Sequence, residues 1–189
     1  MSLVGSLNLA RFQLAFAQVM AVSDPATTQP IKLPQRKCIR LPLGEYRVSG
    51  VSFFITICCH QKKPLLLPFG RRELVRRILV RLALQQRVEL AAYTVIPTHT
   101  HFVASAGTHG LIGFVRDFKS ATARVLRRRG LSVQVRQRSF FDHKLRSDES
   151  LVRKCGYIWM NPVRLGLAKK PEDYRWSGAV LDGCHYTFG

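Results

Sequence analysis

The apolar run VSFFITICC at residues 51–59 restricts the fold more than any other segment. Its β-branched and aromatic side chains suit a strand inside a core. A second run, VELAAYTVI at residues 88–96, predicts another strand, which Pro97 stops and the following HFVAS resumes. Helical patterns lie between and after these strands. This irregular alternation predicts an α+β fold whose antiparallel sheet has four to five strands, with the helices packed on one face.

Three helices are expected, and two of them are strongly basic. Residues 72–87 and residues 111–130 both place apolar side chains near helical spacing and carry several arginines. A third helix begins at Ser147, which can cap it, and runs to Pro162. Because a proline disfavours helical geometry in the residue before it, we expect Asn161 at the end of that helix.

The charge balance points to a polyanionic partner. The chain has 189 residues, with 30 Lys and Arg against 11 Asp and Glu and a formal net charge of +19. Basic groups that neutralise phosphates release counterions, so such an excess favours binding to nucleic acid. The alternative is a ribosomal or otherwise merely adhesive basic protein.

The organisation of the chain predicts one domain after a short extension. Residues 1–30 end in the turn-rich SDPATTQP and are expected to be a flexible N-terminal extension, and residues 31–189 form the domain. The five cysteines include no CxxC pair, so reduced thiols in a cytoplasmic protein are expected. No apolar run reaches the ~18 residues that span a membrane, so no membrane association is expected.

Two histidines stand two residues apart in VIPTHTHFV. On an extended strand His99 and His101 project from the same face, at a spacing that suits two nitrogen donors on one metal ion. An HxH pair alone is a weak signal, however. A surface pair or a hydrogen-bonded pair is the alternative, and on spacing alone it is the commoner one.

A tyrosine and an asparagine share a helical face in GYIWMNPVRLG. Tyr157 and Asn161 are four residues apart. A tyrosine beside a divalent ion and phosphate-binding arginines is a plausible nucleophile, but its unperturbed pKa near 10 requires a base or nearby positive charge. The alternative is a packed tyrosine whose hydroxyl is satisfied.

A nearly continuous basic tract supplies candidate DNA contacts. Aromatic residues interleave with it and could stack on unpaired bases, although several of them must instead belong to the core. The candidate DNA-binding residues are Lys119, Arg124, Arg127, Arg128, Arg136, Arg138, His143, Lys144 and Arg146, and the aromatic residues are Phe140, Phe141, Tyr174 and Trp176. For Lys119 a solvated helix face, and for His143 a structural hydrogen bond, are equal alternatives.

Several segments together resemble the REP-associated tyrosine transposases (RAYTs), a group within the HUH single-tyrosine transposases. The matching segments are RKCIRLP, FFITICCHQKK, AYTVIPTHTHFV, DFKSATARVLRRRG, RQRSFFDHKLRSDES and YIWMNPVRLGLAKKPEDYRWS, in the order of the family. The pattern YI-x-x-NPVR-x-G is the most specific of them.

The resemblance implies a ferredoxin-like HUH endonuclease fold, with the histidines on a central strand and Tyr157 on a helix lying across it. It also implies metal-dependent nicking and strand transfer on single-stranded or hairpin DNA, such as repetitive extragenic palindromes. His99, His101 and Asn161 would bind Mg²⁺ or Mn²⁺. Tyr157 would attack the phosphodiester, giving a 5′-phosphotyrosine and a free 3′-hydroxyl. Relatives of this kind suggest a monomer or a homodimer, associated with the bacterial nucleoid.

Three residues depart from the family pattern near the site. Thr98 replaces an expected asparagine, Thr100 an expected bulky apolar residue, and Trp159 an expected histidine. None of these changes removes a ligand or the nucleophile. They motivate one alternative, a catalytically decayed protein that binds DNA hairpins. A zinc-dependent RNA or ribosomal factor is disfavoured because the cysteines are not paired for zinc.

Overall fold

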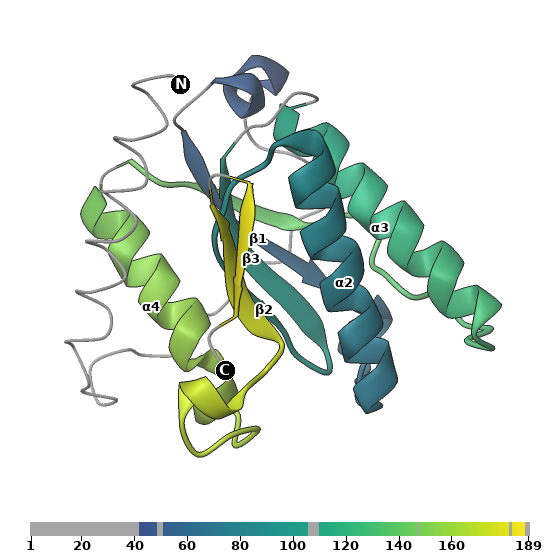
Figure 1. The fold of residues 1–189 in the computed structure, drawn as a ribbon. Helices are drawn as coiled ribbons and strands as arrows, with labels where there is room; N and C mark the ends of the chain where they lie inside the picture. The colour runs from purple at the N-terminus through teal and green to yellow at the C-terminus, as the bar shows by residue number, and fades with distance from the viewer. Residues whose placement is uncertain (1–41, 49–50, 106–109, 147, 182, 188–189) are drawn as a thin grey trace.

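A computed structural model describes residues 42–48, 51–105, 110–146, 148–181 and 183–187. The expected extension, residues 1–30, and the expected cap, Ser147, lie outside the described residues. The elements follow one another as η2 (Leu43–Arg47), β1 (Ser52–Cys58), η3 (His60–Lys62), α2 (Phe69–Gln86), β2 (Leu90–Val95), β3 (His99–Ser105), α3 (Gly110–Arg128), β4 (Phe141–Lys144), α4 (Asp148–Arg164), η4 (Pro171–Asp173), β5 (Ser177–Leu181) and β6 (Cys184–Thr187) (Figure 1).

The strands form one antiparallel sheet in the order β4-β1-β3-β2-β5-β6. Its first four members, with α2 and α3, make a βαββαβ unit in which β3 pairs between β1 and β2, the split arrangement of ferredoxin-like folds. The predicted α+β class and antiparallel sheet are therefore confirmed, as is the central position of the histidine strand. The predicted number of strands is too low, because the C-terminal hairpin β5–β6 extends the sheet to six.

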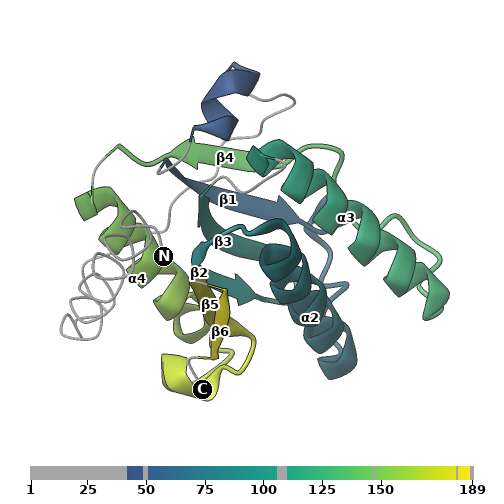
Figure 2. The same cartoon turned by 45° about the horizontal axis from the view of Figure 1, so that its top comes forward.

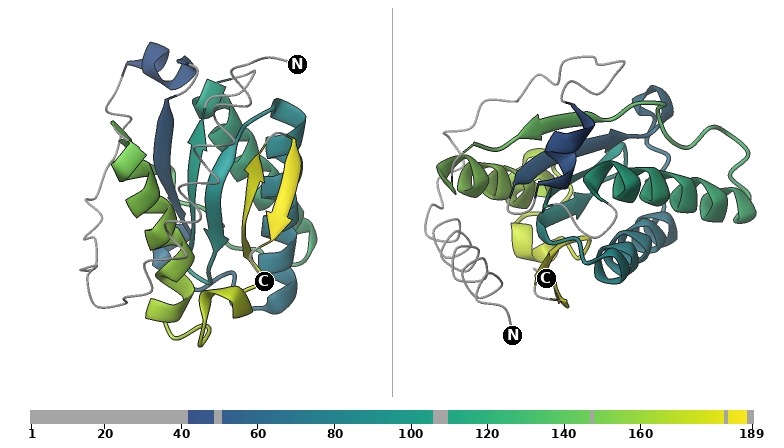
Figure 3. Two further views of the ribbon diagram at one scale, coloured as in Figure 1. Left: turned by 60° about the vertical axis from the view of Figure 1, so that its left-hand side comes forward. Right: turned by 90° about the horizontal axis from the view of Figure 1, so that it is seen from above.

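Helices cover both faces of the sheet, so the expectation of helices on one face is wrong. Helices α2 and α3 lie on one face and α4 on the other (Figures 2 and 3). The reason is visible in β1, where Phe53 and Ile55 join the core beneath α2 and α3 while Phe54 joins a second apolar cluster with Leu151 and Ile158 of α4. Because alternate residues of β1 are apolar on both sides, each face needs a cover.

Helix α4 does not end at Asn161. It continues through Pro162 to Arg164 and closes at Gly166, whose φ of +64° is in the left-handed region that favours glycine. A proline at this position removes one backbone donor near the end of the helix, a loss that the packing of α4 against the sheet can offset. Asn161 is therefore held within regular helix, and its carbonyl accepts a bond from the Leu165 amide (3.2 Å). Within the described part of the chain, no helix is long and apolar enough to cross a membrane.

Candidate active site

The two histidines converge on the face of the sheet that α4 covers. Their Nε2 atoms are 2.6 Å apart and their rings meet edge to face, with centroids 4.2 Å apart. Pairing β3 with β1 places His99 opposite Cys58 and His101 opposite Thr56. The strand geometry thus aims both Nε2 atoms at one point, as the spacing predicts.

A threonine hydroxyl holds the far nitrogen of each ring. The Oγ1 of Thr56 lies 2.7 Å from His101 Nδ1, and the Oγ1 of Thr98 lies 2.8 Å from His99 Nδ1. Without a metal ion, the two Nε2 atoms share a hydrogen bond in which one of them carries the proton. When both Nδ1–H groups donate to the hydroxyls instead, both Nε2 lone pairs are free to bind a metal. The two hydroxyls therefore fix the orientation of both rings.

Burial keeps both imidazoles neutral. It lowers the pKa of His99 to about 4, with Arg136 and Lys62 adding positive charge nearby. It also lowers the pKa of His101 well below its usual value, and His99 and Lys154 act in the same direction. Neutral imidazole is the form that binds metal ions.

Tyr157 lies directly beside this pair. Its ring centroid is 5.6 Å from that of His101 and 6.0 Å from that of Phe54. The side chain is half-buried, and burial raises the pKa of its phenol above the usual value, while the charge of Arg164 opposes the rise. A histidine pair on a central strand and a tyrosine on the helix across it thus come together from β3 and α4.

Two cations flank the tyrosine. The Arg164 guanidinium lies 5.2 Å from the centroid of the Tyr157 ring, and the Lys154 ammonium lies 6.0 Å from it. One guanidinium nitrogen of Arg164, Nη1, is buried and has no hydrogen-bond partner among the described residues. Positive charge of this kind stabilises a phenolate and attracts a phosphate group.

Asn161 is the third candidate ligand, one turn beyond Tyr157 on the same face of α4. It is 5% exposed, and its Nδ2 has no hydrogen-bond partner in the described part of the chain. This NH₂ group is a hydrogen-bond donor that could reach a phosphate oxygen, whereas a metal ion would bind the Oδ1 atom of the same amide. Among the described residues, no group of three or more His, Cys, Asp or Glu side chains could hold a metal ion. The candidate donors are therefore the two imidazoles and, from the facing helix, the Asn161 amide.

These donors fit a divalent ion that also takes oxygen ligands from water and phosphate. Imidazole nitrogens bind at about 2.1 Å, so two of them on one ion stand roughly 3 Å apart. The rings of His99 and His101, now 2.6 Å apart at Nε2, need to open by only a few tenths of an ångström. A donor set without carboxylates also leaves the charge of the ion to be balanced by the phosphate.

The three departures from the family pattern leave this arrangement in place. Thr98 bonds to the His99 ring, and Thr100 is buried on the opposite side of β3, where the Arg136 guanidinium approaches its hydroxyl (3.5 Å). Trp159 is two residues beyond Tyr157, about 200° around the helix, and therefore points away from the face of Tyr157.

The predicted DNA-binding residues fall into two groups. Five of them line one cavity between α3 and the segment 131–138: Lys119, Arg124, Arg127, Arg136 and Arg138.

The other four lie outside that cavity. Arg128 is exposed near the end of α3, and His143 and Arg146 are exposed in and after the edge strand β4. Lys144 forms an ion pair with Glu45 at 2.5 Å. The edge of the sheet at β4 thus carries exposed basic side chains.

Two of the four aromatic residues are not available for base stacking. Tyr174 and Trp176 belong to the main core, and the Tyr174 hydroxyl donates to the Val95 carbonyl (2.8 Å). Phe140 and Phe141 are half-buried. The expectation that some of these rings are core residues is confirmed for Tyr174 and Trp176.

Sequence reasoning missed Thr56, Lys154 and Arg164. The two cations could have been found, because they lie three residues before and seven residues after Tyr157, the spacing of one helical face. Thr56 carries no local signal, since its contact depends on the register of β1 against β3.

A βαββαβ core with a histidine pair on its central strand and a tyrosine on the facing helix is the arrangement expected of a RAYT-like protein. Comparison with known proteins supports this class. Over 138 residues the chain is 23% identical to the REP-associated tyrosine transposase of Escherichia coli K12. The aligned region covers 71% of this chain and 82% of that protein. The chain is thus similar to a REP-associated tyrosine transposase, as its motifs predict.

Two further comparisons concern an uncharacterised protein and a solved structure. An uncharacterised protein of Haemophilus influenzae is 25% identical over 160 residues, covering 68% of this chain and 88% of that protein. The solved structure of a REP-associated tyrosine transposase bound to a REP hairpin has the same fold, with a TM-score of 0.60 and 21% identity over 76% of this chain and 82% of that one. No protein-family model matches the sequence.

Proposed function

We propose that the protein is a transposase-like enzyme that nicks DNA and transfers the strand through Tyr157. The observation that carries this proposal is the contact between the His99–His101 pair and the Tyr157 ring, with centroids of His101 and Tyr157 5.6 Å apart. A merely packed tyrosine would not require two flanking cations or a buried histidine pair beside it. The solved relative holds a REP hairpin, so single-stranded or hairpin DNA is the substrate class we propose.

The proposed reaction is a single displacement at phosphorus. The Tyr157 oxygen forms a bond to phosphorus, the bond from phosphorus to the 3′ oxygen breaks, and the electron pair leaves with that oxygen. The phenol proton passes to solvent, and the 3′ oxygen takes up a proton to give a free 3′-hydroxyl. The chain keeps the 5′ end as a phosphotyrosine, and attack by a 3′-hydroxyl on this ester completes the strand transfer.

Side chains around the tyrosine have separate roles in this step. Arg164 and Lys154 stabilise the phenolate and draw the scissile phosphate toward it. The neutral His99 and His101, with the amide of Asn161, would hold a divalent ion, Mn²⁺ or Mg²⁺. When bound, such an ion supplies Lewis-acid polarisation of the phosphate. Imidazole donors make Mn²⁺ the better first choice.

One chain contributes all of these residues, because β3 and α4 pack together within the described structure. This supports a site that is complete in a single subunit. The exposed basic residues near β4 would hold the DNA beyond the site.

A denaturing gel tests the proposal. A labelled hairpin with a single-stranded flank is incubated with protein and Mn²⁺, and Tyr157→Phe is compared with Tyr186→Phe, an exposed tyrosine of β6. We expect Tyr186→Phe to cleave the DNA like wild type, and Tyr157→Phe to bind the hairpin without cleaving it. Cleavage by Tyr157→Phe would refute the role of the tyrosine, and binding without cleavage by wild type would instead support a decayed DNA-binding protein.

A further inference from the structure

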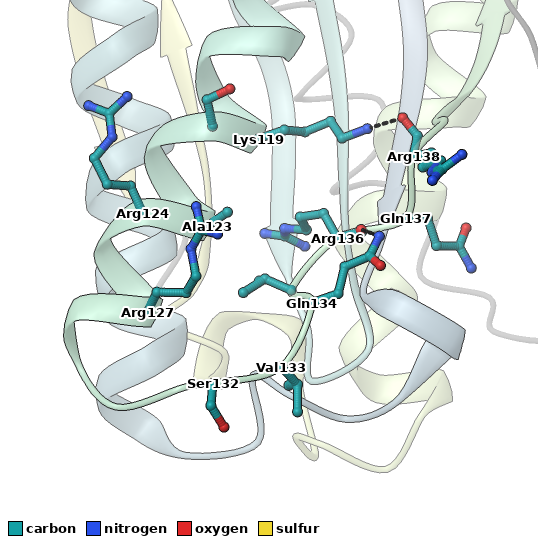
Figure 4. A pocket seen from close by; sticks show the side chains of 12 residues that line it. Lys119, Ala123, Arg124, Arg127, Ser132, Val133, Gln134, Arg136, Gln137 and Arg138 are labelled. Carbon is teal, nitrogen blue, oxygen red and sulfur yellow. Dashed lines mark hydrogen bonds between the residues drawn. The ribbon is translucent and has the colours of Figure 1, made fainter.

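The basic cavity between α3 and the segment 131–138 lies away from the histidines and the tyrosine. It has a volume of about 710 Å³ and opens between the second half of α3 and the segment 131–138. Figure 4 shows the side chains around it. Five of the lining residues are cationic, and no acidic residue lines it among those the structure describes: the cations are Lys119, Arg124, Arg127, Arg136 and Arg138. A volume of this size suits a small-molecule ligand or one to two nucleotides.

The cavity is distinguished from a simple basic surface by Arg136. This residue is 5% exposed, and its hydrogen-bond partners among the described residues are the Ile57 carbonyl, the Cys59 sulfur and the Thr100 hydroxyl, none of which is a carboxylate. Nη1 donates to the Ile57 carbonyl (3.3 Å), and the guanidinium lies 5.5 Å from the centroid of Phe118. The Nε atom is buried without a hydrogen-bond partner among the described residues. A buried charge without a counterion is unfavourable, so an anion in the cavity would relieve it.

Hydrogen bonds hold the segment that forms the wall of the cavity against α3 and β1. The Lys119 ammonium donates to the Arg138 carbonyl (2.6 Å) and the Ser139 carbonyl (3.3 Å), which ties the segment after the cavity to α3 (Figure 4). On the other side Arg136 pairs with Cys59 across an isolated β-bridge, next to the end of β1. Preorganised donors of this kind bind an anion with little loss of side-chain entropy.

The cavity is on the opposite face of the sheet from the candidate active site. Arg136 approaches Thr100, which faces away from the two histidines on the same strand. The two sites therefore lie on opposite faces of β3, and no side chain that would face a ligand belongs to both of them.

We propose that this cavity is a second site, which binds the phosphate groups of a nucleotide or of a DNA strand, with Arg136 as its buried anchor. Arg124 and Arg127 supply the exposed side of the site, because both are exposed on α3 and face the cavity. Binding here requires neither cleavage nor Tyr157.

The test compares variants that remove one charge each. Arg127→Gln removes a cavity charge, and Arg81→Gln, on the exposed face of α2, removes one charge elsewhere. Arg136→Lys is a third variant, which keeps the charge but loses the fork of donors, and a thermal unfolding scan shows whether it folds. The full chain is titrated by calorimetry with pyrophosphate and with deoxyadenosine, and by anisotropy with a labelled unstructured oligonucleotide, at fixed ionic strength.

We expect pyrophosphate to bind, deoxyadenosine not to bind, and Arg127→Gln to weaken pyrophosphate roughly tenfold while Arg81→Gln changes it less than about twofold. If pyrophosphate displaces the oligonucleotide and Arg127→Gln weakens both, the phosphate belongs to a DNA strand. If only pyrophosphate responds, the site takes free nucleotides. Equal effects of Arg127→Gln and Arg81→Gln, or no binding of either phosphate ligand to the cavity, would overturn the proposal.

Discussion

At the scale of single residues, the hydroxyls behind the histidines matter as much as the histidines. Thr56 and Thr98 each contact the Nδ1 of one ring, so both Nε2 atoms are directed to the same point. A threonine in place of the family's asparagine at position 98 therefore still supplies an oxygen to the ring of His99.

Replacing Thr56 by valine tests this support for the proposed metal site. Valine keeps the shape of the side chain but loses the hydroxyl, so the His101 ring is no longer held. We expect Mn²⁺ to bind about 10 to 100 times more weakly, as measured by electron paramagnetic resonance titration. The matched control is Thr100→Val, because Thr100 lies on the same strand and faces away. Equal Mn²⁺ affinity in Thr56→Val and wild type would contradict this role.

Arg164 is expected to set the reactivity of Tyr157. Burial raises the pKa of the phenol, and Arg164 opposes that rise, so its loss moves the pKa further up. Below that pKa the phenolate fraction increases about tenfold per pH unit. Arg164→Gln should therefore slow single-turnover cleavage by roughly ten- to a hundredfold between pH 7 and 9, and the rate should still rise with pH.

Lys169→Gln is the control for Arg164, because Lys169 is exposed beyond the end of α4. We expect its pH profile to match that of wild type. A rate for Arg164→Gln that no longer rises with pH would indicate a structural effect instead of an effect on the phenol.

At the scale of elements, the strongly patterned segments could be predicted and the short ones could not. Strands β1 and β2 and helices α2 and α3 carry long apolar or amphipathic patterns, and the sequence places all four within a few residues of their bounds. Strand β4 has four residues with no alternation, and its pairing with β1 depends on tertiary contacts. The same holds for the short, largely exposed β6.

Glu73 on α2 makes the fold sensitive to acid. Its carboxylate accepts bonds from Arg76 (2.8 and 3.1 Å) and Arg77 (2.7 Å), and the hydrogen bonds of Arg76, with those of Arg77, lower its pKa from 4.5 to about 2. An unfolded chain takes up this proton first as the pH falls. The stability that Glu73 contributes is therefore complete above about pH 4.5 and is lost as the pH falls toward 2.

Glu73→Gln should lower the free energy of unfolding by about 0.5 to 1 kcal/mol at pH 7, since the pair is partly exposed. The difference from wild type should shrink at pH 3. Urea unfolding at pH 7 and pH 3 measures this difference in the free energy of unfolding. Glu172→Gln is the control, because Glu172 is exposed. A constant difference at both pH values would argue against the ion pair as its source.

Gly178 is the tightest point of the hairpin β5–β6. A Cβ atom there would overlap the Tyr186 carbonyl and come within 2.6 Å of the Tyr93 hydroxyl, which itself bonds to His185 (2.6 Å). Gly178→Ala should therefore loosen β6 and lower the free energy of unfolding by about 2 to 3 kcal/mol. Gly70→Ala, where the Cβ meets open space, should change it by less than about 1 kcal/mol. Urea unfolding of the two variants compares them, and equal effects would contradict the clash.

At the scale of the whole molecule, the sheet separates the two proposed sites. The face under α4 carries the histidines and the tyrosine, and the face under α2 and α3 carries the phosphate cavity beside Arg136. Sequence spacing predicts which residues share a strand or a helical face, and so it predicts the pairs His99–His101 and Tyr157–Asn161. It cannot predict that Arg136 is buried behind the histidine strand, because that contact joins residues far apart in the chain.

The most direct measurement of the central claim is the identity of the residue that becomes linked to DNA. Protein is incubated with Mn²⁺ and a hairpin substrate, the covalent adduct is isolated and digested, and the peptides are sequenced by mass spectrometry. We predict a nucleotide attached through its 5′ phosphate to the peptide that contains Tyr157. An adduct on any of the other four tyrosines (Tyr46, Tyr93, Tyr174 and Tyr186), or cleavage of the hairpin without any adduct, would contradict the account.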